Sequence, residues 1–139
     1  MSGEFVDTNI LVYAHDNSAG RKREIATDLL RRLSKRRTGQ TSVQVLSELY
    51  VTLTRKLPKP LASEAAADIV ADFATWLAFS PGPADVVEGI RIARRCQISF
   101  WDAMIIRAAT ALESDVVWSE DLNSGQVYEG VTVRSPFSA

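Results

Sequence analysis

Phe5-Val6-Asp7-Thr8-Asn9 is the stretch from which the fold of this chain is most readily predicted. Two apolar residues lead into an acid, and a hydroxyl and an amide follow before the apolar run resumes at Ile10. Side chains just past the carboxyl ends of strands in an open parallel sheet face the ligand crevice. A carboxylate there suits a hard cation such as Mg²⁺ or Mn²⁺. Asp7 would equally serve as a cap for the following turn, so its role depends on partners elsewhere in the chain.

Outward from this strand, short apolar runs alternate with longer segments of helical periodicity. The apolar runs predict strands over residues 4–7, 115–118 and 131–133, with room for very short strands at 38–41 and 76–79. Helical spacing and capping residues predict helices over 9–14, 21–36, 42–57, 61–75, 84–96 and 99–112. Strands that alternate with helices indicate a mostly parallel sheet covered on both faces. The predicted fold class is therefore α/β, with a short central sheet flanked by helices.

Length and composition predict one globular domain over residues 1–139. The hydrophobic fraction of 46% and the charged fraction of 24% are ordinary for a protein with a real core. No apolar run approaches the roughly 20 residues that a membrane-spanning helix needs. Acidic Glu4 ahead of a short apolar run differs from the basic-then-apolar order of a signal peptide. We expect a cytoplasmic protein with no membrane partner.

The chain has one cysteine, Cys96, and one histidine, His15. A single cysteine excludes an internal disulfide and a thiolate zinc site. A single histidine excludes histidine-rich metal sites and leaves His15 as the only base for a Ser-His-Asp triad. If the protein is a hydrolase, its working groups are therefore expected to be carboxylates.

Basic residues are clustered although the net charge is only −1. Eight of the 16 lysines and arginines lie between Arg21 and Arg37, and Arg91, Arg94 and Arg95 form a second cluster. Local basic clusters beside an acidic centre fit a ligand with a phosphate backbone. The alternative interpretation is a solvated helix face, which is the common role of charge runs.

Three further acids are candidates to join Asp7. Asp121, like Asp7, lies within three residues of the end of an apolar strand, and parallel strands place such ends along one edge. Glu48 falls off the apolar stripe of its helix, and Asp102 lies near a helix start after Ser99. Each also has an ordinary structural explanation as a cap, a turn residue or a solvated side chain; Ser99 and Asp102 fit a capping box.

Taken together, the four acids have a chemical purpose. Hydrolysis of a phosphodiester needs neutralisation of the phosphoryl charge and an activated in-line water, and carboxylate-bound Mg²⁺ or Mn²⁺ supplies both. Acids that crowd together repel one another unless a cation lies among them. Ser119 and Asn9 are neutral oxygen donors close to two of the acids in sequence, suited to orienting such a site.

The same segments resemble, in chain order, the motifs of PIN-domain nucleases. The resemblance spans essentially the whole chain. The segments that carry it are Phe5-Val6-Asp7-Thr8-Asn9, Ser47-Glu48-Leu49, Phe100-Trp101-Asp102-Ala103, Ser119-Glu120-Asp121-Leu122 with Gly125-Gln126 and Gly130-Val131, and the closing Val133-Arg134-Ser135-Pro136-Phe137.

The resemblance is closest to the toxin half of VapBC-type toxin–antitoxin pairs. It implies a Mg²⁺- or Mn²⁺-dependent ribonuclease that cuts structured RNA such as transfer or ribosomal RNA, a homodimer, and a cognate antitoxin that inhibits it. Asp7, Glu48, Asp102 and Asp121 would bind the metal, and Ser119 would take a supporting hydroxyl position where members often carry Thr. The family does not cut all RNAs alike, so the target does not carry over.

Two other functions remain open. One is a Mg²⁺ phosphohydrolase with Asp7 as covalent nucleophile, although such sites commonly place a second acid two residues on, where this chain has Asn9. The other is a PIN-like module that binds RNA or protein without turnover. Trp76 and Phe137 are expected to be exposed for an interface, whereas Trp101 is expected to face inward.

Overall fold

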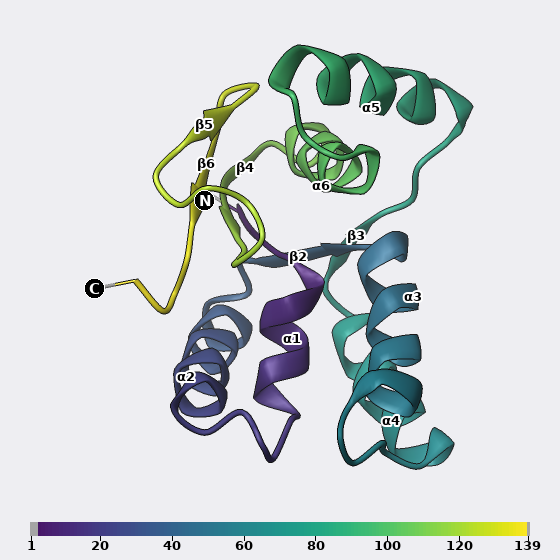
Figure 1. The fold of residues 1–139 in the computed structure, drawn as a ribbon, viewed down its shortest axis with the longest axis vertical. Helices are drawn as coiled ribbons and strands as arrows, with labels where there is room; N and C mark the ends of the chain where they lie inside the picture. The colour runs from purple at the N-terminus through teal and green to yellow at the C-terminus, as the bar shows by residue number, and fades with distance from the viewer. Residues whose placement is uncertain (1–2, 139) are drawn as a thin grey trace.

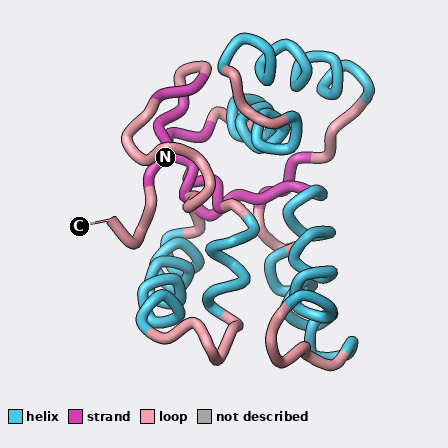
Figure 2. Tube along the Cα trace, in the orientation of Figure 1, coloured by secondary structure: helices cyan, strands magenta, loops and turns pink. Residues whose placement is uncertain are grey.

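The computed structural model describes residues 3–138 and folds them around one six-stranded sheet. Helices α1 to α4 lie on one side of the sheet and α5 and α6 on the other (Figure 1). The strands form the middle layer, as the magenta segments of Figure 2 show. The strands are β1 (Gly3–Val6), β2 (Gly39–Ser42), β3 (Leu77–Phe79), β4 (Ser114–Trp118), β5 (Val127–Tyr128) and β6 (Val131–Arg134). The helices are α1 (Thr8–Ala14), α2 (Arg21–Arg36), α3 (Val43–Val51), the π-helical η1 (Thr52–Lys56), α4 (Ser63–Phe73), α5 (Pro83–Cys96) and α6 (Phe100–Ala111).

The order of the strands in the sheet is β3-β2-β1-β4-β6-β5. Every neighbouring pair is parallel except β5 with β6, which is antiparallel. The chain therefore builds outward from β1 in one direction through β2 and β3, and then returns to the other side of β1 with β4. Ligand crevices in open α/β sheets lie at such a reversal, outside the carboxyl ends of the strands. Asp7 and Ser119 directly follow the two strands at this point.

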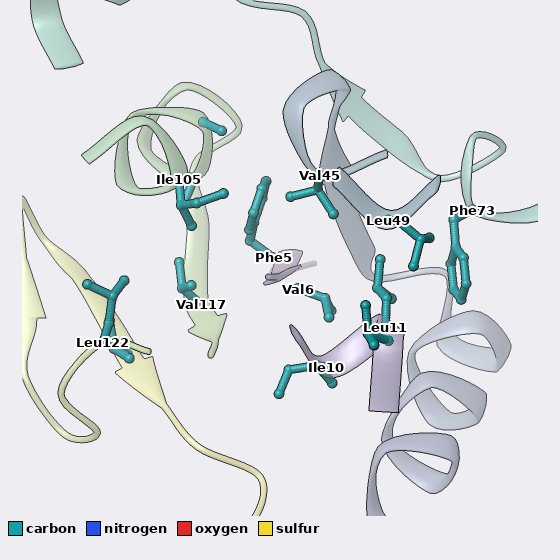
Figure 3. Close-up of a cluster of buried hydrophobic side chains, with 14 of the residues drawn as sticks. Phe5, Val6, Ile10, Leu11, Val45, Leu49, Phe73, Ile105, Val117 and Leu122 are labelled. Atoms are coloured by element: carbon teal, nitrogen blue, oxygen red, sulfur yellow. The ribbon is translucent and has the colours of Figure 1, made fainter. Parts of the chain in front are cut away.

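The core fills the space between the sheet and the helices. Phe5 and Val6 are fully buried, and successive side chains of a strand point to opposite faces. Figure 3 shows Phe5 between Ile105 of α6 and Val45 of α3, with Val6 on the other side of the strand toward Leu11 of α1. β1 therefore joins both layers of the core, and this fixes the backbone immediately before Asp7.

Three helices begin with a side-chain cap. The Asp7 carboxylate accepts the N–H of Thr8 at 2.7 Å at the start of α1, and the Ser42 hydroxyl accepts the N–H of Val45 at 3.2 Å at the start of α3. Ser99 caps α6 in the same way. Such caps satisfy N–H groups that have no partner within the helix. Because β1 and β2 lead directly into α1 and α3, these helix starts lie at the carboxyl edge of the sheet.

The α/β fold class and the mostly parallel sheet predicted from the sequence are confirmed. Strand β5 was not predicted, because two residues are too short for any periodicity. The helix expected to run to residue 57 leaves α-helical geometry at Thr52 and continues as the π-helical η1. The Thr54 hydroxyl donates a hydrogen bond to the carbonyl of Tyr50, four residues earlier, at 2.8 Å. Such bonds often bend helices.

Expectations for three aromatic residues are wrong. Trp101 is 62% exposed, because it lies in the first turn of α6 and the buried positions of that helix begin at Ala103. Trp76 and Phe137 are not exposed as expected, because both are partly buried against the core. Trp76 meets Phe73 edge to face at 5.1 Å between ring centroids, and Phe137 meets Tyr13 at 5.3 Å.

Of the helices within residues 3–138, none combines the length and the apolar character needed to cross a bilayer.

An acidic candidate active site at the carboxyl ends of β1 and β4

Strands β1 and β4 bring Asp7 and Ser119 to the same level of the sheet. Val6 pairs with Trp118 in parallel register, and the N–H of Asp7 donates to the carbonyl of Trp118 at 2.9 Å. The residue that follows each strand therefore emerges at one edge. The expectation that the ends of these two strands meet is confirmed by this register.

The Asp7 carboxylate is almost fully buried, with 5% of the residue exposed, and both its oxygens are engaged. One oxygen caps α1 through Thr8, and the other accepts the Ser119 hydroxyl at 2.8 Å. The structural role as a cap and the position beside Ser119 are thus compatible. Asp7 is held in a single orientation by two different elements.

Ser119 joins Asp7 to Asp121. Its buried hydroxyl donates to Asp7 and accepts the N–H of Asp121 at 3.1 Å. Asn9 supports the same turn, since its side-chain oxygen accepts the N–H of Glu120 at 3.3 Å. The Asn9 amide nitrogen is buried and has no hydrogen-bond partner within residues 3–138.

Glu48 and Asp102 approach from helices α3 and α6. The Thr8 hydroxyl donates to Glu48 at 3.1 Å. Because Thr8 directly follows Asp7 in the chain, this bond brings Glu48 close to Asp7. Gln44 donates to the other oxygen of Glu48 at 3.1 Å and reaches the carbonyl of Trp101 at 3.4 Å, which links the two helices. Asp102 follows in the first turn of α6, with its N–H bonded to the hydroxyl of its cap.

Electrostatics connects these acids into one set. Burial raises the pKa of Asp7 from its ordinary value of 3.8 to about 7. The hydrogen bonds from Ser119 and Thr8 oppose that rise in pKa, and the negative charges of Asp121 and Asp102 add to it. The pKa of Asp102 is also raised, first by burial and then by Asp121 and Glu48, against the hydrogen bond to its cap. The structure thus brings the four predicted acids close enough to repel one another.

The donor set fits a hard divalent cation, although the acids are not yet arranged around one. Every candidate ligand is an oxygen, as Mg²⁺ and Mn²⁺ prefer. A cation would offset the burial and the repulsion that raise the pKa of Asp7. No three acidic, histidine or cysteine side chains in the described part of the chain form a ready ligand group. Ligation by several of these acids therefore requires side chains such as Glu48 to reorient.

Sequence reasoning missed several residues around the site. Thr8 and Gln44 hold Glu48, and Tyr13 and Lys22 bind the carboxylate of Glu120. Gln44 lies four residues before Glu48 on a helix, a spacing that predicts contact. The contact of Tyr13 with Glu120 spans 107 positions and leaves no signal in a single sequence.

The two basic clusters differ in their ion pairs. Arg91 pairs with Glu88 and Glu129, and Arg95 lies 3.6 Å from Glu129, so two of the three arginines of the α5 cluster are paired. Arg94 is exposed and takes part in no ion pair within the described residues. On α2, Arg21 and Arg23 are exposed and take part in no ion pair within residues 3–138. They flank Lys22, whose ammonium binds Glu120 in the turn that carries Asp121. Exposed positive charge therefore flanks the contact between the start of α2 and this turn.

The fold is thus an α/β sheet with an acidic site beside its strand reversal. The model of the PIN domain family matches residues 5–129, so the chain belongs to the PIN-domain family. No curated protein sequence matches the chain.

Solved structures of VapC toxins and their complexes share the fold. A toxin–antitoxin complex from Klebsiella pneumoniae aligns with a TM-score of 0.71 at 16% identity, over 99% of this chain and 100% of that chain. The DNA-bound VapBC of Salmonella typhimurium aligns at 0.67 and 19%, over 98% and 99%. VapC20 of Mycobacterium tuberculosis, a sarcin–ricin-loop-cleaving toxin, aligns at 0.66 and 18%, over 84% and 88%.

Proposed function

We propose that this protein is a Mg²⁺- or Mn²⁺-dependent endoribonuclease and the toxin of a toxin–antitoxin pair. The observation that carries the proposal is the buried Asp7 carboxylate, whose pKa is raised to about 7 in a set with Asp121, Asp102 and Glu48. Burial of an acid beside other acids is costly unless a cation occupies the site, and perturbed pKa values gather at functional sites. Membership of the PIN-domain family supports the same conclusion.

Asp7, Glu48, Asp102 and Asp121 would hold the divalent ion. When bound, the ion supplies charge neutralisation at the phosphate and a water of lowered pKa. Ser119 keeps one Asp7 oxygen oriented by donating to it, and it also fixes the backbone of Asp121. These contacts pre-position the Asp7 carboxylate and the backbone of Asp121, which reduces the reorganisation needed at the moment of reaction.

RNA would bind through the start of α2. Arg21 and Arg23 are exposed and free of ion pairs within the described residues, whereas Arg91 and Arg95 of α5 are paired with glutamates. Phosphate contacts from such residues supply affinity that falls with salt. Structured RNA such as transfer or ribosomal RNA is the proposed substrate class, supported by the sarcin–ricin-loop cleavage ascribed to the similar VapC20.

A small cognate antitoxin is the proposed protein partner, since similar folds occur in toxin–antitoxin complexes.

A homodimer is proposed through α5, where Val86, Val87 and Ile90 are exposed, with Val87 at 68%. Exposed aliphatic residues on one helix commonly mark an interface. Light scattering of wild type and of Val87→Glu tests this: a dimer that becomes a monomer supports it, and a wild-type monomer contradicts it.

The decisive experiment compares RNA cleavage by wild type and Asp7→Asn, each with Mn²⁺ and with EDTA. RNA ends are sequenced after brief expression and after incubation of purified protein with a total RNA pool. We expect new ends only for wild type with metal. Equal cleavage by Asp7→Asn, or cleavage in EDTA, would contradict the proposal. Metal binding without cleavage of any RNA would instead favour a PIN-like binding module.

A further inference from the structure

Side-chain hydrogen bonds hold in place the turn that follows β4. The N–H of Glu120 is bound by the side chain of Asn9, and the N–H of Asp121 by the hydroxyl of Ser119. The same hydroxyl donates to Asp7. A displacement of this turn would therefore move both a proposed ligand and the group that orients Asp7.

Glu120 points its carboxylate away from the acids and toward helices α1 and α2. The Tyr13 hydroxyl, in the last turn of α1, donates to one oxygen, and the Lys22 ammonium, in the first turn of α2, binds the other. The Lys22 ammonium also lies 5.0 Å from the centroid of the Tyr13 ring and 5.3 Å from that of Phe137. Those two rings meet edge to face. The carboxylate is thus fixed by two donors whose own positions are fixed by packing.

The Lys22–Glu120 contact is a partly exposed ion pair at the surface of the molecule. The side chains of Lys22 and Glu120 are 44% and 31% exposed, and pairs at such exposure add little to stability. Its consequence is geometric instead, because Glu120 lies between Ser119 and Asp121 in the chain. If Glu120 were released, the turn would lose its contacts with Tyr13 and Lys22, and a fifth carboxylate could enter the acidic set.

We propose that Glu120, held by Tyr13 and Lys22, is a positioning residue that keeps Asp121 beside Asp7 and keeps its own charge out of the cation site. The inference rests on the proposed function, since it concerns how the site binds its divalent ion. Residues that orient metal ligands without touching the metal typically change affinity by about 10–100-fold when replaced.

The proposal is tested by Mn²⁺ binding to the metal-stripped protein. Electron paramagnetic resonance measures the free Mn²⁺ that remains. We expect Glu120→Gln to weaken binding ~10–100-fold. Tyr13→Phe removes one hydroxyl and should weaken binding about fivefold, as for one hydrogen bond. Tyr13→Phe and Glu120→Gln should combine less than additively, because both changes weaken the same contact. Glu64→Gln, an exposed acid on α4, is the matched control and should bind like wild type.

RNA cleavage at increasing Mn²⁺ separates positioning from damage to the fold. For Glu120→Gln we expect the Mn²⁺ requirement to rise by the same factor as the binding constant, with kcat restored at saturating Mn²⁺. A variant with a damaged fold would instead lose kcat at all Mn²⁺ concentrations and unfold at a lower temperature. If Glu120→Gln unfolds, Tyr13→Phe decides alone.

The outcomes distinguish this inference from the proposed function. A wild-type chain that neither binds Mn²⁺ nor cuts RNA overturns both. If wild type binds Mn²⁺ and Asp7→Asn does not, but Glu120→Gln and Tyr13→Phe bind as wild type does, only the positioning role is overturned. Strictly additive effects of Tyr13→Phe and Glu120→Gln would also overturn it, because the two residues would then act separately.

Discussion

The candidate site has two halves that are built differently. Asp7 and Ser119 come from adjacent parallel strands, are buried, and bind each other directly. Glu48 and Asp102 come from helices α3 and α6, are exposed or partly buried, and are held through Thr8, Gln44 and a helix cap. The sheet thus supplies a fixed half of the site and the helices an adjustable half. Cation binding would draw the helix half toward the strand half.

The largest expected effect is on RNA cleavage, which should fall more when the strand half of the site is changed than when the helix half is changed. Asp7→Asn should lower RNA cleavage on the order of a thousandfold or more, because stabilisation by a metal ion amounts to several kcal/mol. No other side chain can take the place of this buried carboxylate, whose two oxygens are both bound. Glu48→Gln should cost less, about 10–100-fold, because the exposed side chain can adjust its position. Single-turnover cleavage with Mn²⁺ measures both. Equal losses would mean that the halves do not differ in this way.

The second prediction concerns stability of the metal-free protein. Because the folded pKa of Asp7, about 7, lies above its ordinary 3.8, the folded state binds the proton more tightly than the unfolded state. Stability from this group is therefore present below pH 4 and lost as the pH rises toward 7, by up to roughly 4 kcal/mol. Asp7→Asn should remove that loss and be the more stable protein above pH 7. Urea unfolding with EDTA from pH 4 to 8 measures this.

Glu48→Gln is the control for that measurement, because Glu48 is exposed and lies in the adjustable half of the site. It should leave the pH dependence of unfolding close to that of wild type. An Asp7→Asn chain with the same pH dependence as wild type would show that burial of Asp7 does not carry the effect.

The third prediction concerns the hydroxyl that joins the fixed half together. Ser119→Ala leaves Asp7 without one donor and Asp121 without its backbone acceptor, so cleavage should fall about 10–100-fold. Because that hydrogen bond lowers the pKa of Asp7, its loss should shift the pH profile of metal-free unfolding further upward. Ser119→Thr keeps the hydroxyl and should retain most activity. Equal activity of the Ala and Thr variants would contradict this role.

The smallest effect is expected at the link between α3 and α6. Gln44→Ala frees one oxygen of Glu48 and breaks the contact to the carbonyl of Trp101, while the strand half remains untouched. A partly exposed hydrogen bond contributes about 1 kcal/mol, so the Mn²⁺ requirement for cleavage should rise about fivefold. Titration of cleavage with Mn²⁺ measures it. A loss as large as that of Ser119→Ala would show that the helix half is as fixed as the strand half.

The difference between the halves also explains what could be predicted from the sequence. Asp7 and Asp121 each follow an apolar strand, and parallel pairing alone places such residues along one edge. Glu48 and Asp102 were found as acids on helices, but their approach depends on how α3 and α6 pack, which periodicity does not specify. The resemblance to a family, rather than spacing, linked them to the strand acids.

Contacts between distant side chains lay beyond reach for the same reason. Nothing local predicts that Tyr13 would meet Glu120, because each position alone reads as a surface residue. Trp101 was misplaced because helical periodicity assigns a face but not where a helix emerges from its neighbours. Two-residue β5 forms only because β6 offers a partner in antiparallel register.

The sheet ends on both sides in very short strands, three residues in β3 and two in β5. An edge strand can pair with a strand of another chain through its unpaired N–H and C=O groups, and strands this short present few such groups. Two copies that meet would consequently associate through side chains on helices rather than by extending a common sheet. Assembly would then stay finite and reversible, and the chain would resist growth into fibres at high concentration.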